Sequence, residues 1–318
     1  MTAPAILSTT VVGAGAVGSF YGAMLARAGH AVTLVARPAH VEAIRAHGLQ
    51  LQMGGQVHRV PLAATTGLDA VRGADLVLFC VKSTDTDAVA SAIAPWLDDD
   101  ALVMSLQNGV ENAPTIARRV QRPVLPTVVY VATAMPGPGE VSHHGRGDLV
   151  VGPADADAAG DPALARRIED LAEVFAAAGI PVRVSATVVA GLWSKLMVNC
   201  AYNAVSGLAQ ATYAELAAQP EVVALQEAVV AEVVALAAAE GVPMALPAAL
   251  EAMHAIARAM PGQRSSTAQD MARGRPSEID HLNGFVARRG QVLGVATPVN
   301  QTLHALVKLV EASAIRTR

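Results

Sequence analysis

Cysteine is scarce in this chain, since only two of its 318 residues, Cys80 and Cys200, are of this type. Each lies inside an apolar run, which is typical of reduced cysteines in the core of a cytosolic protein. We therefore expect no structural disulfide and a cytoplasmic location. Net charge is also low, at −4, so electrostatics gives no reason to expect a nucleic acid or an anionic membrane as partner.

The N-terminal segment lacks charge as well, because the first charged side chain is Arg27. A secretory signal would carry basic residues before its apolar run, and this chain has none there. Four glycines between residues 13 and 22 also interrupt the run, which disfavours a membrane span. We expect neither a signal peptide nor a membrane anchor, and no internal repeat or low-complexity linker stands out.

The chain is long enough for two domains, each with its own core. Strand and helix patterns alternate through the first half, which predicts a parallel, doubly wound α/β sheet of Rossmann type. Residues 138–152 predict turns and short antiparallel strands, and a helix over 164–179 follows. From about residue 187 helical patterns follow one another, so we place a boundary near Ser185, between a Rossmann domain (1–185) and an all-α domain (186–318).

A glycine-rich loop follows the first expected strand and opens a helix. Gly13 permits a tight turn, Gly15 lets backbone N–H groups approach a pyrophosphate, and Gly18 allows the helix to pack closely on the strand. The helix N-terminus adds partial positive charge. The alternative is a glycine-rich turn without a ligand. The expected nucleotide contacts are Gly13, Ala14, Gly15, Ala16, Val17 and Gly18.

The end of the second strand indicates which nucleotide binds. An NAD site carries an acidic residue about 20 positions beyond the loop, whereas this chain has Ala36 and then Arg37. An arginine there matches a 2′-phosphate, which an acid would repel. Lys82, after a neighbouring strand, would add a second positive charge, although an ordinary solvated lysine explains it equally well. The sequence therefore predicts NADPH as cofactor.

Residues 195–203, KLMVNCAYN, combine an apolar helix pattern with three polar side chains at steps of four. In an α-helix Lys195, Asn199 and Asn203 drift by only about 40° per step and form one stripe. The rest of the circumference is apolar, which is typical of a buried helix. We expect the stripe to face an internal cleft. A purely structural stripe, satisfied by a carboxylate of another helix, is the alternative.

Three further polar residues lie in segments suited to a site. Asn108 follows a strand on the crevice side of the sheet, although Asn-Gly is also a common turn pair. Ser266 and Glu278 lie in the stretch RSSTAQDMARGRPSEID. Glu278 is expected in the first turn of a helix after Pro276, where the helix dipole favours a carboxylate in any case.

Taken in order, these motifs resemble the ketopantoate reductases (2-dehydropantoate 2-reductases), and the resemblance runs over nearly the whole chain. It implies an N-terminal Rossmann domain that binds NADPH and an all-helical domain that binds the substrate. The motifs that carry it are GAGAVG at 13–18, QNG at 107–109, the Lys-x-x-x-Asn-x-x-x-Asn helix at 195–203, SSTAQD at 265–270 and EIDHLNG at 278–284.

The resemblance also implies a role for each matching residue. Lys195 would be the general acid at the keto oxygen. Asn199 and Asn203 would bind the hydroxyl end of the substrate, and Ser266 its carboxylate. Glu278 would bind both the substrate hydroxyl and the lysine, as a second catalytic residue.

The cofactor half of the site follows from the same resemblance. Asn108 would lie beside the nicotinamide and the substrate, with Arg37 and Lys82 at the 2′-phosphate. No metal site is implied.

The chain departs from the family at two positions where members often carry asparagine, since it has Tyr213 and Gln263 there. These departures loosen the assignment of substrate, and paralogues of different substrate exist in such families. A 3-hydroxyacid dehydrogenase and a non-catalytic NADP-binding sensor on the same fold remain alternatives. The expected partner is a small 2-keto acid, and a homodimer through the helical domain is compatible with the sequence.

Overall fold

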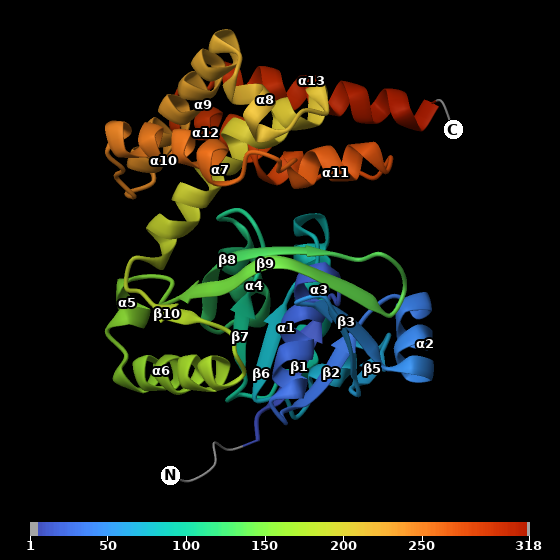
Figure 1. Cartoon of the computed structure of the whole chain (residues 1–318). Helices are drawn as coiled ribbons and strands as arrows, with labels where there is room; N and C mark the ends of the chain where they lie inside the picture. Colours follow the sequence, from blue (N-terminus) through green and yellow to red (C-terminus); the bar gives the residue numbers. More distant parts are fainter. Residues whose placement is uncertain (1–5, 317–318) are drawn as a thin grey trace. The chain divides into compact units, whose positions relative to one another are not determined.

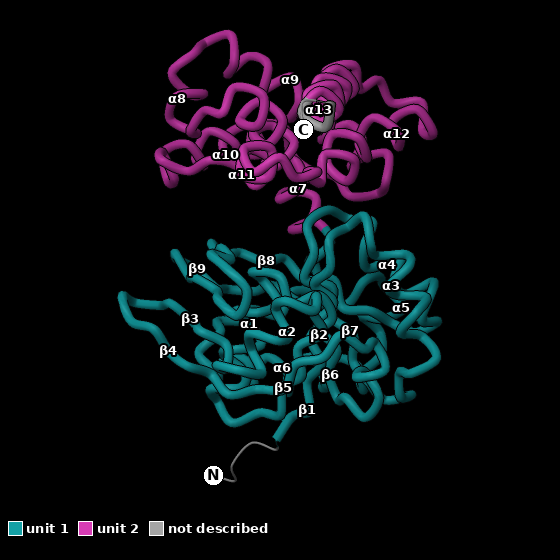
Figure 2. Tube along the Cα trace, turned by 90° about the vertical axis from the view of Figure 1, so that its right-hand side faces the viewer, with its two compact units in different colours: residues 1–189 teal, residues 190–318 magenta. Residues whose placement is uncertain are grey.

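The computed structural model of this protein describes residues 6–316, and contacts along the chain divide it into two compact units, residues 1–189 and residues 190–318 (Figure 2). The boundary expected near Ser185 lies just before helix α7 (Val188–Ala209), in which the division falls. The first five residues, part of the segment checked for a signal peptide, lie outside the described residues.

Unit 1 alternates strands with helices, as the sequence predicts. Its strands are β1 (Ser8–Val12), β2 (Ala31–Val35), β3 (Leu49–Met53), β4 (Gln56–Val60), β5 (Ala63–Thr65), β6 (Leu76–Phe79), β7 (Leu102–Ser105), β8 (Val124–Ala134), β9 (Glu140–Val151) and β10 (Val182–Val184). Its helices are α1 (Ala16–Arg27), α2 (Pro38–His47), α3 (Thr86–Ile93), α4 (Asn112–Val120), α5 (Ala156–Ala159) and α6 (Pro162–Ala177).

The strands form one mixed sheet in the order β4-β3-β9-β8-β7-β6-β1-β2-β5, and β10 pairs with β9. The stretch from β8 to β5 is parallel throughout. β2 and then β5 lie on one side of β1, and β6 and then β7 lie on its other side (Figure 1). The strand order thus reverses between β1 and β6, where doubly wound sheets bind ligands at the carboxyl ends. The predicted Rossmann fold is confirmed.

Helices cover both faces of this parallel sheet because its central strands are apolar on both faces. Val11 and Val12, consecutive in β1, belong to two different cores. The first core includes Leu25 of α1, and the second includes Ile93 of α3. Successive side chains of a strand point to opposite faces, so one apolar run supplies both cores.

The structure corrects the sequence analysis at the other side of the sheet. The expected short strands in 138–152 are one long strand, β9, which runs antiparallel to β8 with two register shifts. The antiparallel pair β3–β4 was not expected. Its turn is Gly54-Gly55, both at positive φ (+59° and +75°), a pair typical of a two-residue hairpin turn.

Unit 2 is entirely helical over its described residues, which confirms the predicted fold class. Its helices are α7 from Ala190 on, α8 (Tyr213–Ala217), α9 (Pro220–Ala239), α10 (Leu246–Ala259), α11 (Ser266–Ala272), α12 (Asn283–Leu293) and α13 (Pro298–Arg316). Among residues 6–316, α9 alone is long and apolar enough to cross a membrane. In this unit it packs against α8, α10, α12 and α13.

Candidate active site

The loop between β1 and α1 requires glycine at its first position. Gly13 has φ +92°, and a Cβ on it would lie 2.6 Å from the backbone nitrogen of Val81, in the segment after β6. Both the backbone conformation and the space therefore exclude a side chain. The backbone N–H groups of Gly13 and Ala14 donate to the carbonyl of Val35 at 3.1 and 2.9 Å. These bonds attach the loop to the carboxyl end of β2.

The other two glycines of the loop differ in their surroundings. A Cβ on Gly18 would lie 2.7 Å from the carbonyl oxygen of Gly13 and 2.8 Å from Cγ1 of Val11, so glycine here lets α1 pack closely on β1. A Cβ on Gly15 would meet nothing within 4 Å. Gly15 is also the N-cap of α1 and supplies no side-chain cap. An open, positively polarised helix N-terminus of this kind fits a diphosphate.

A buried histidine that the sequence analysis missed supports the loop. His40 of α2 accepts the N–H of Gly139 on Nδ1 at 2.7 Å, so its proton lies on Nε2, 3.2 Å from the hydroxyl of Ser19. Ser19 in turn donates to the carbonyl of Ala14 at 3.2 Å. Burial lowers the pKa of His40, which favours the neutral ring that this chain of hydrogen bonds requires.

The two cations predicted at the 2′-phosphate follow strands on either side of β1. Arg37 comes after β2 as the N-cap of α2, and Lys82 comes after β6 as the N-cap of a short 3₁₀ turn. Both side chains are exposed. The guanidinium of Arg37 makes no hydrogen bond or ion pair with any other residue in 6–316. Because β1, β2 and β6 are parallel, both residues lie at the same edge of the sheet as the glycine loop.

Asn108 lies in the turn after β7, and Gly109 beside it has φ +89°. The carbonyl of Asn108 accepts the side-chain N–H of Asn112 at 2.7 Å. Asn112 is buried and also accepts the hydroxyl of Thr86 at 2.8 Å, and Thr86 accepts Nε2 of Gln107 at 2.7 Å. This buried network fixes the turn, so the turn interpretation of Asn-Gly is correct for the backbone. The side chain of Asn108 is half-buried.

The polar stripe of α7 lies on a helix that is apolar and buried around most of its circumference, as expected. Asn203 is only 3% exposed, and Lys195 and Asn199 are half-buried. The apolar residues packed into the core are Leu192, Trp193, Leu196, Met197, Cys200, Ala201 and Tyr202.

The structure brings Asn203 together with Ser266, although 62 residues separate them in sequence. Nδ2 of Asn203 donates to the hydroxyl of Ser266 at 3.4 Å. Ser265, the residue before Ser266, holds the two segments together. It is the N-cap of α11, and its hydroxyl donates to the carbonyl of Asn203 at 3.3 Å. The N–H of Ser265 donates to the hydroxyl of Ser206 at 3.2 Å. Asn203 and Ser266 thus present an amide and a hydroxyl at one place in unit 2.

The expectation that Glu278 lies in the first turn of a helix after Pro276 is wrong. Glu278 is the N-cap residue of a single 3₁₀ turn, Ile279–His281, and its side chain does not cap that turn. The next α-helix, α12, starts only at Asn283. The hydroxyl and N–H of Ser277 instead bind a carboxylate of α13, which commits this segment to tertiary contacts. Helix-dipole stabilisation therefore does not explain the half-buried carboxylate of Glu278.

The two positions that depart from the family adjoin one another. The backbone N–H of Tyr213 donates to the carbonyl of Gln263 at 2.9 Å. The ring of Tyr213 is buried against Tyr202, with ring centroids 4.6 Å apart. Burial, with the neighbouring Tyr202, raises the pKa of the Tyr213 phenol to about 12, so it stays neutral. An aromatic surface therefore takes the place of a short amide.

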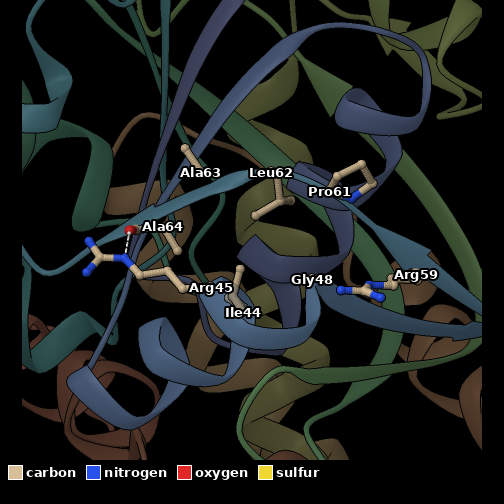
Figure 3. A pocket seen from close by; sticks show the side chains of 8 residues that line it. All are labelled: Ile44, Arg45, Gly48, Arg59, Pro61, Leu62, Ala63 and Ala64. Atoms are coloured by element: carbon tan, nitrogen blue, oxygen red, sulfur yellow. Dashed lines mark hydrogen bonds between the residues drawn. The ribbon is translucent and has the colours of Figure 1, made fainter.

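A cavity of about 720 Å³ on unit 1 involves none of the predicted site residues. It lies between α2, β4 and β5, where Arg45 donates to the carbonyl of Ala64 at 2.9 Å and Arg59 lines the opposite side (Figure 3). Ala63, at the amino end of β5, lines it as well. The cavity is thus at the edge of the sheet opposite the glycine loop.

Comparison with known proteins agrees with the pattern of these residues. A curated 2-dehydropantoate 2-reductase of Vibrio cholerae is 31% identical over 96% of this chain and 99% of its own length. The crystal structure of a PanE/ApbA family ketopantoate reductase from Ralstonia eutropha JMP134 is 51% identical, with a TM-score of 0.87 over 96% of this chain and 99% of that one. A D-mandelate dehydrogenase, solved with NADH and anilino(oxo)acetate, has a TM-score of 0.88 at 26% identity, over 96% and 99% of the two chains.

Two family descriptions match in succession. Residues 9–156 match "Ketopantoate reductase PanE/ApbA", and residues 187–311 match its "C terminal" counterpart. The first match contains the glycine loop and Asn108, and the second contains the stripe of α7, Ser266 and Glu278. The chain belongs to the PanE/ApbA ketopantoate reductase family.

Proposed function

We propose that this protein is an NADPH-dependent reductase of a small branched 2-keto acid, with 2-dehydropantoate (ketopantoate) as its substrate and pantoate as its product. The observation that carries the proposal is the hydrogen bond between Asn203 and Ser266. It joins the stripe of α7, which begins with Lys195, to the α11 segment that the family resemblance associates with the substrate carboxylate. The expected physiological role is in pantothenate and coenzyme A biosynthesis.

Lys195 is the general acid in this proposal. Its ammonium group stabilises negative charge on the keto oxygen and supplies the proton that completes the alcohol. Half-burial favours this role, because water screens a charge less there than on an open surface. Glu278 holds the lysine and the substrate hydroxyl in place.

The remaining polar residues orient the substrate. Ser266 donates its hydroxyl to the substrate carboxylate, and the amides of Asn199 and Asn203 bind the terminal hydroxyl. Asn203 is nearly fully buried, so its amide is costly to leave without a partner. In this proposal Asn108 contacts the nicotinamide.

Bound NADPH supplies the hydride. The glycine loop, from Gly13 to Gly18, accommodates its diphosphate, since Gly15 faces open space and α1 has no side-chain cap. Arg37 and Lys82 bind the 2′-phosphate, and a charge-assisted pair with Arg37 favours NADPH over NADH. In this proposal residues 1–185 form the cofactor domain and residues 186–318 the substrate domain.

We expect this reductase in the cytoplasm. Both cysteines are free, which suits a reducing compartment. A homodimer through the helical domain stays a prediction, as does the absence of nucleic-acid and membrane partners.

A second candidate is a 2-keto acid with a larger or aromatic substituent. Two observations favour it, namely the buried pair of Tyr202 and Tyr213 at a position where asparagine is common in the family and the likeness to D-mandelate dehydrogenase. The carboxylate and ketone contacts of Lys195 and Ser266 would serve both substrates.

A substrate panel separates the two candidates. NADPH oxidation is followed by absorbance with ketopantoate, 2-ketoisovalerate and phenylglyoxylate, each at several concentrations. We expect the highest kcat/KM with ketopantoate. Turnover of phenylglyoxylate without turnover of ketopantoate would favour the second candidate. The reductase proposal would be contradicted if none of the keto acids caused NADPH oxidation.

A further inference from the structure

We infer that α13 acts as a positioning element for Glu278, through a group of side chains that we call the α13 clamp: Ser277 and Asp280 on one side, and His304, Lys308 and Glu311 on the other. This inference rests on the proposed function, because it concerns the carboxylate assigned to the substrate and Lys195. The residues of the clamp touch neither reacting atom in this account and act through Glu278.

The residue before Glu278 is attached firmly to α13. Oε1 of Glu311 accepts both the backbone N–H of Ser277 at 2.8 Å and its hydroxyl at 2.6 Å. Ser277 is 4% exposed and the Glu311 side chain 10% exposed, so water competes little for these bonds. The Ser277 hydroxyl also accepts the N–H of Ile279 at 3.3 Å. The Ser277 hydroxyl therefore links the peptide N–H that follows Glu278 to the carboxylate of Glu311.

The second residue after Glu278 is attached to the same helix. Asp280 accepts Nε2 of His304 at 2.6 Å and Nζ of Lys308 at 2.8 Å. Burial opposes ionisation of Asp280, yet the hydrogen bonds from Lys308 and His304 hold the pKa of its carboxyl below the usual value. Lys308 also lies 3.5 Å from Oε2 of Glu311. One lysine therefore connects the two attachment points.

Close packing leaves this segment little freedom to shift. Ile279 is fully buried, and a Cβ on Gly284 would lie 2.8 Å from the His304 ring. Glycine at 284 thus allows His304 to approach Asp280. Glu278 lies between two attachments one and two residues away, so the position of α13 constrains the backbone from which its carboxylate extends.

Helix α13 is itself connected to the helix that carries Lys195. Glu232 of α9 accepts the backbone N–H groups of Val299 and Asn300 at 2.8 and 2.9 Å, and so caps the start of α13. The fully buried Asn300 accepts Nδ2 of Asn283 at 2.9 Å, and Asn283 also donates to the carbonyl of Cys200 on α7 at 3.1 Å. A continuous hydrogen-bonded frame within unit 2 therefore relates Glu278 to α7.

Lys308→Met tests the clamp with little risk to folding, because the Lys308 side chain is 44% exposed. We expect kcat/KM for the keto acid to fall about tenfold, since small displacements of a positioning carboxylate are costly, while the NADPH Kd is unchanged. Lys308→Arg, which keeps the charge and a donor, should restore most of the activity. The matched control is Arg258→Met, which removes an exposed ion pair with Glu251 on α10 and should leave kcat/KM unchanged.

A double-mutant cycle distinguishes positioning from general damage. If Lys308 acts through Glu278, the tenfold effect of Lys308→Met should shrink to less than about twofold in a Glu278→Gln background. An equal effect in both backgrounds would overturn the inference. So would a kcat/KM for Lys308→Met equal to that of Arg258→Met.

Hydrogen exchange separates failure of the clamp from failure of the proposed function. The amide of Ile279 should exchange faster in Glu311→Gln than in Arg258→Met, because Glu311 holds the hydroxyl that this amide binds. Equal exchange would show that the clamp does not hold the segment. A different result is faster exchange in Glu311→Gln together with a wild-type protein that reduces no keto acid. The clamp would then hold the segment, but its catalytic purpose and the proposed function would both be overturned.

Discussion

Alanine at the second and third glycines of the nucleotide loop should separate cofactor binding from stability. At Gly18 a new Cβ would lie 2.7 Å from the carbonyl oxygen of Gly13 and 2.8 Å from Val11. Both contacts are with groups that move little, a backbone carbonyl and a side chain of the central strand β1. Overpacking of this kind costs about 1–3 kcal/mol, and for a chain of this size we expect Tm to fall by roughly 2–12 °C.

At Gly15 the same substitution meets no atom within 4 Å, and the φ of −76° suits alanine. Reduced entropy of the unfolded chain contributes about 0.4–1 kcal/mol in its favour. Loss of a preferred N-cap residue costs a similar amount, about 1 kcal/mol, so Tm without cofactor should change by less than about 3 °C. The NADPH Kd should nevertheless rise at least tenfold, about 1.4 kcal/mol, because the methyl group occupies the space where backbone approaches diphosphate.

Thermal unfolding without cofactor and titration calorimetry with NADPH measure the two effects. The reasoning fails if Gly15→Ala binds NADPH as tightly as the wild type. It also fails if Gly18→Ala unfolds at the wild-type temperature, since the close packing of α1 on β1 would then be unnecessary.

Three further predictions concern single residues. NADPH should bind at least tenfold more tightly than NADH, and Arg37→Ala should remove most of that preference in calorimetry; equal wild-type affinities would exclude a 2′-phosphate contact. Lys195→Ala should lower kcat by roughly 10²-fold with little change in NADPH affinity, and a near-normal kcat would make the lysine structural. Burial lowers the pKa of His40, so the unfolded chain binds its proton more readily, and stability in urea should fall as pH drops below about 6.5. His40→Gln should weaken that dependence, and an unchanged pH profile would refute the assignment.

Local patterns made much of this protein predictable. The alternation of strand and helix patterns predicted the parallel sheet, and the glycine spacing predicted its nucleotide loop. The strands are legible as continuous apolar runs because they are buried on both faces. Helical spacing in the same way placed Lys195, Asn199 and Asn203 on one stripe, since the angle between residues four apart is fixed by the helix itself. For Asn203 the buried position also followed from its apolar neighbours.

Contacts between distant segments were harder to predict from the sequence. His40 reads as an ordinary residue of an amphipathic helix, and only the fold brings it to Ser19 and Gly139. The helix expected at Glu278 does not form there, because Ser277 and Asp280 bind α13 instead. Such side-chain bonds compete with helix initiation, and their partners lie 24–34 residues away, beyond the reach of periodicity.

The central claim is that the polar residues of unit 2 bind the terminal hydroxyl of ketopantoate. A comparison of ketopantoate with an analogue that lacks this hydroxyl tests it most directly. 3,3-Dimethyl-2-oxobutanoate has the carbon skeleton, ketone and carboxylate of ketopantoate and lacks only the terminal hydroxyl. A site in which Asn199, Asn203 and Glu278 bind that hydroxyl should prefer ketopantoate by a large factor in kcat/KM, up to about 10⁴, because the analogue leaves buried polar groups unpaired. Equal kcat/KM values for the two acids would contradict the account, since the polar stripe of α7 would then have no substrate hydroxyl to bind.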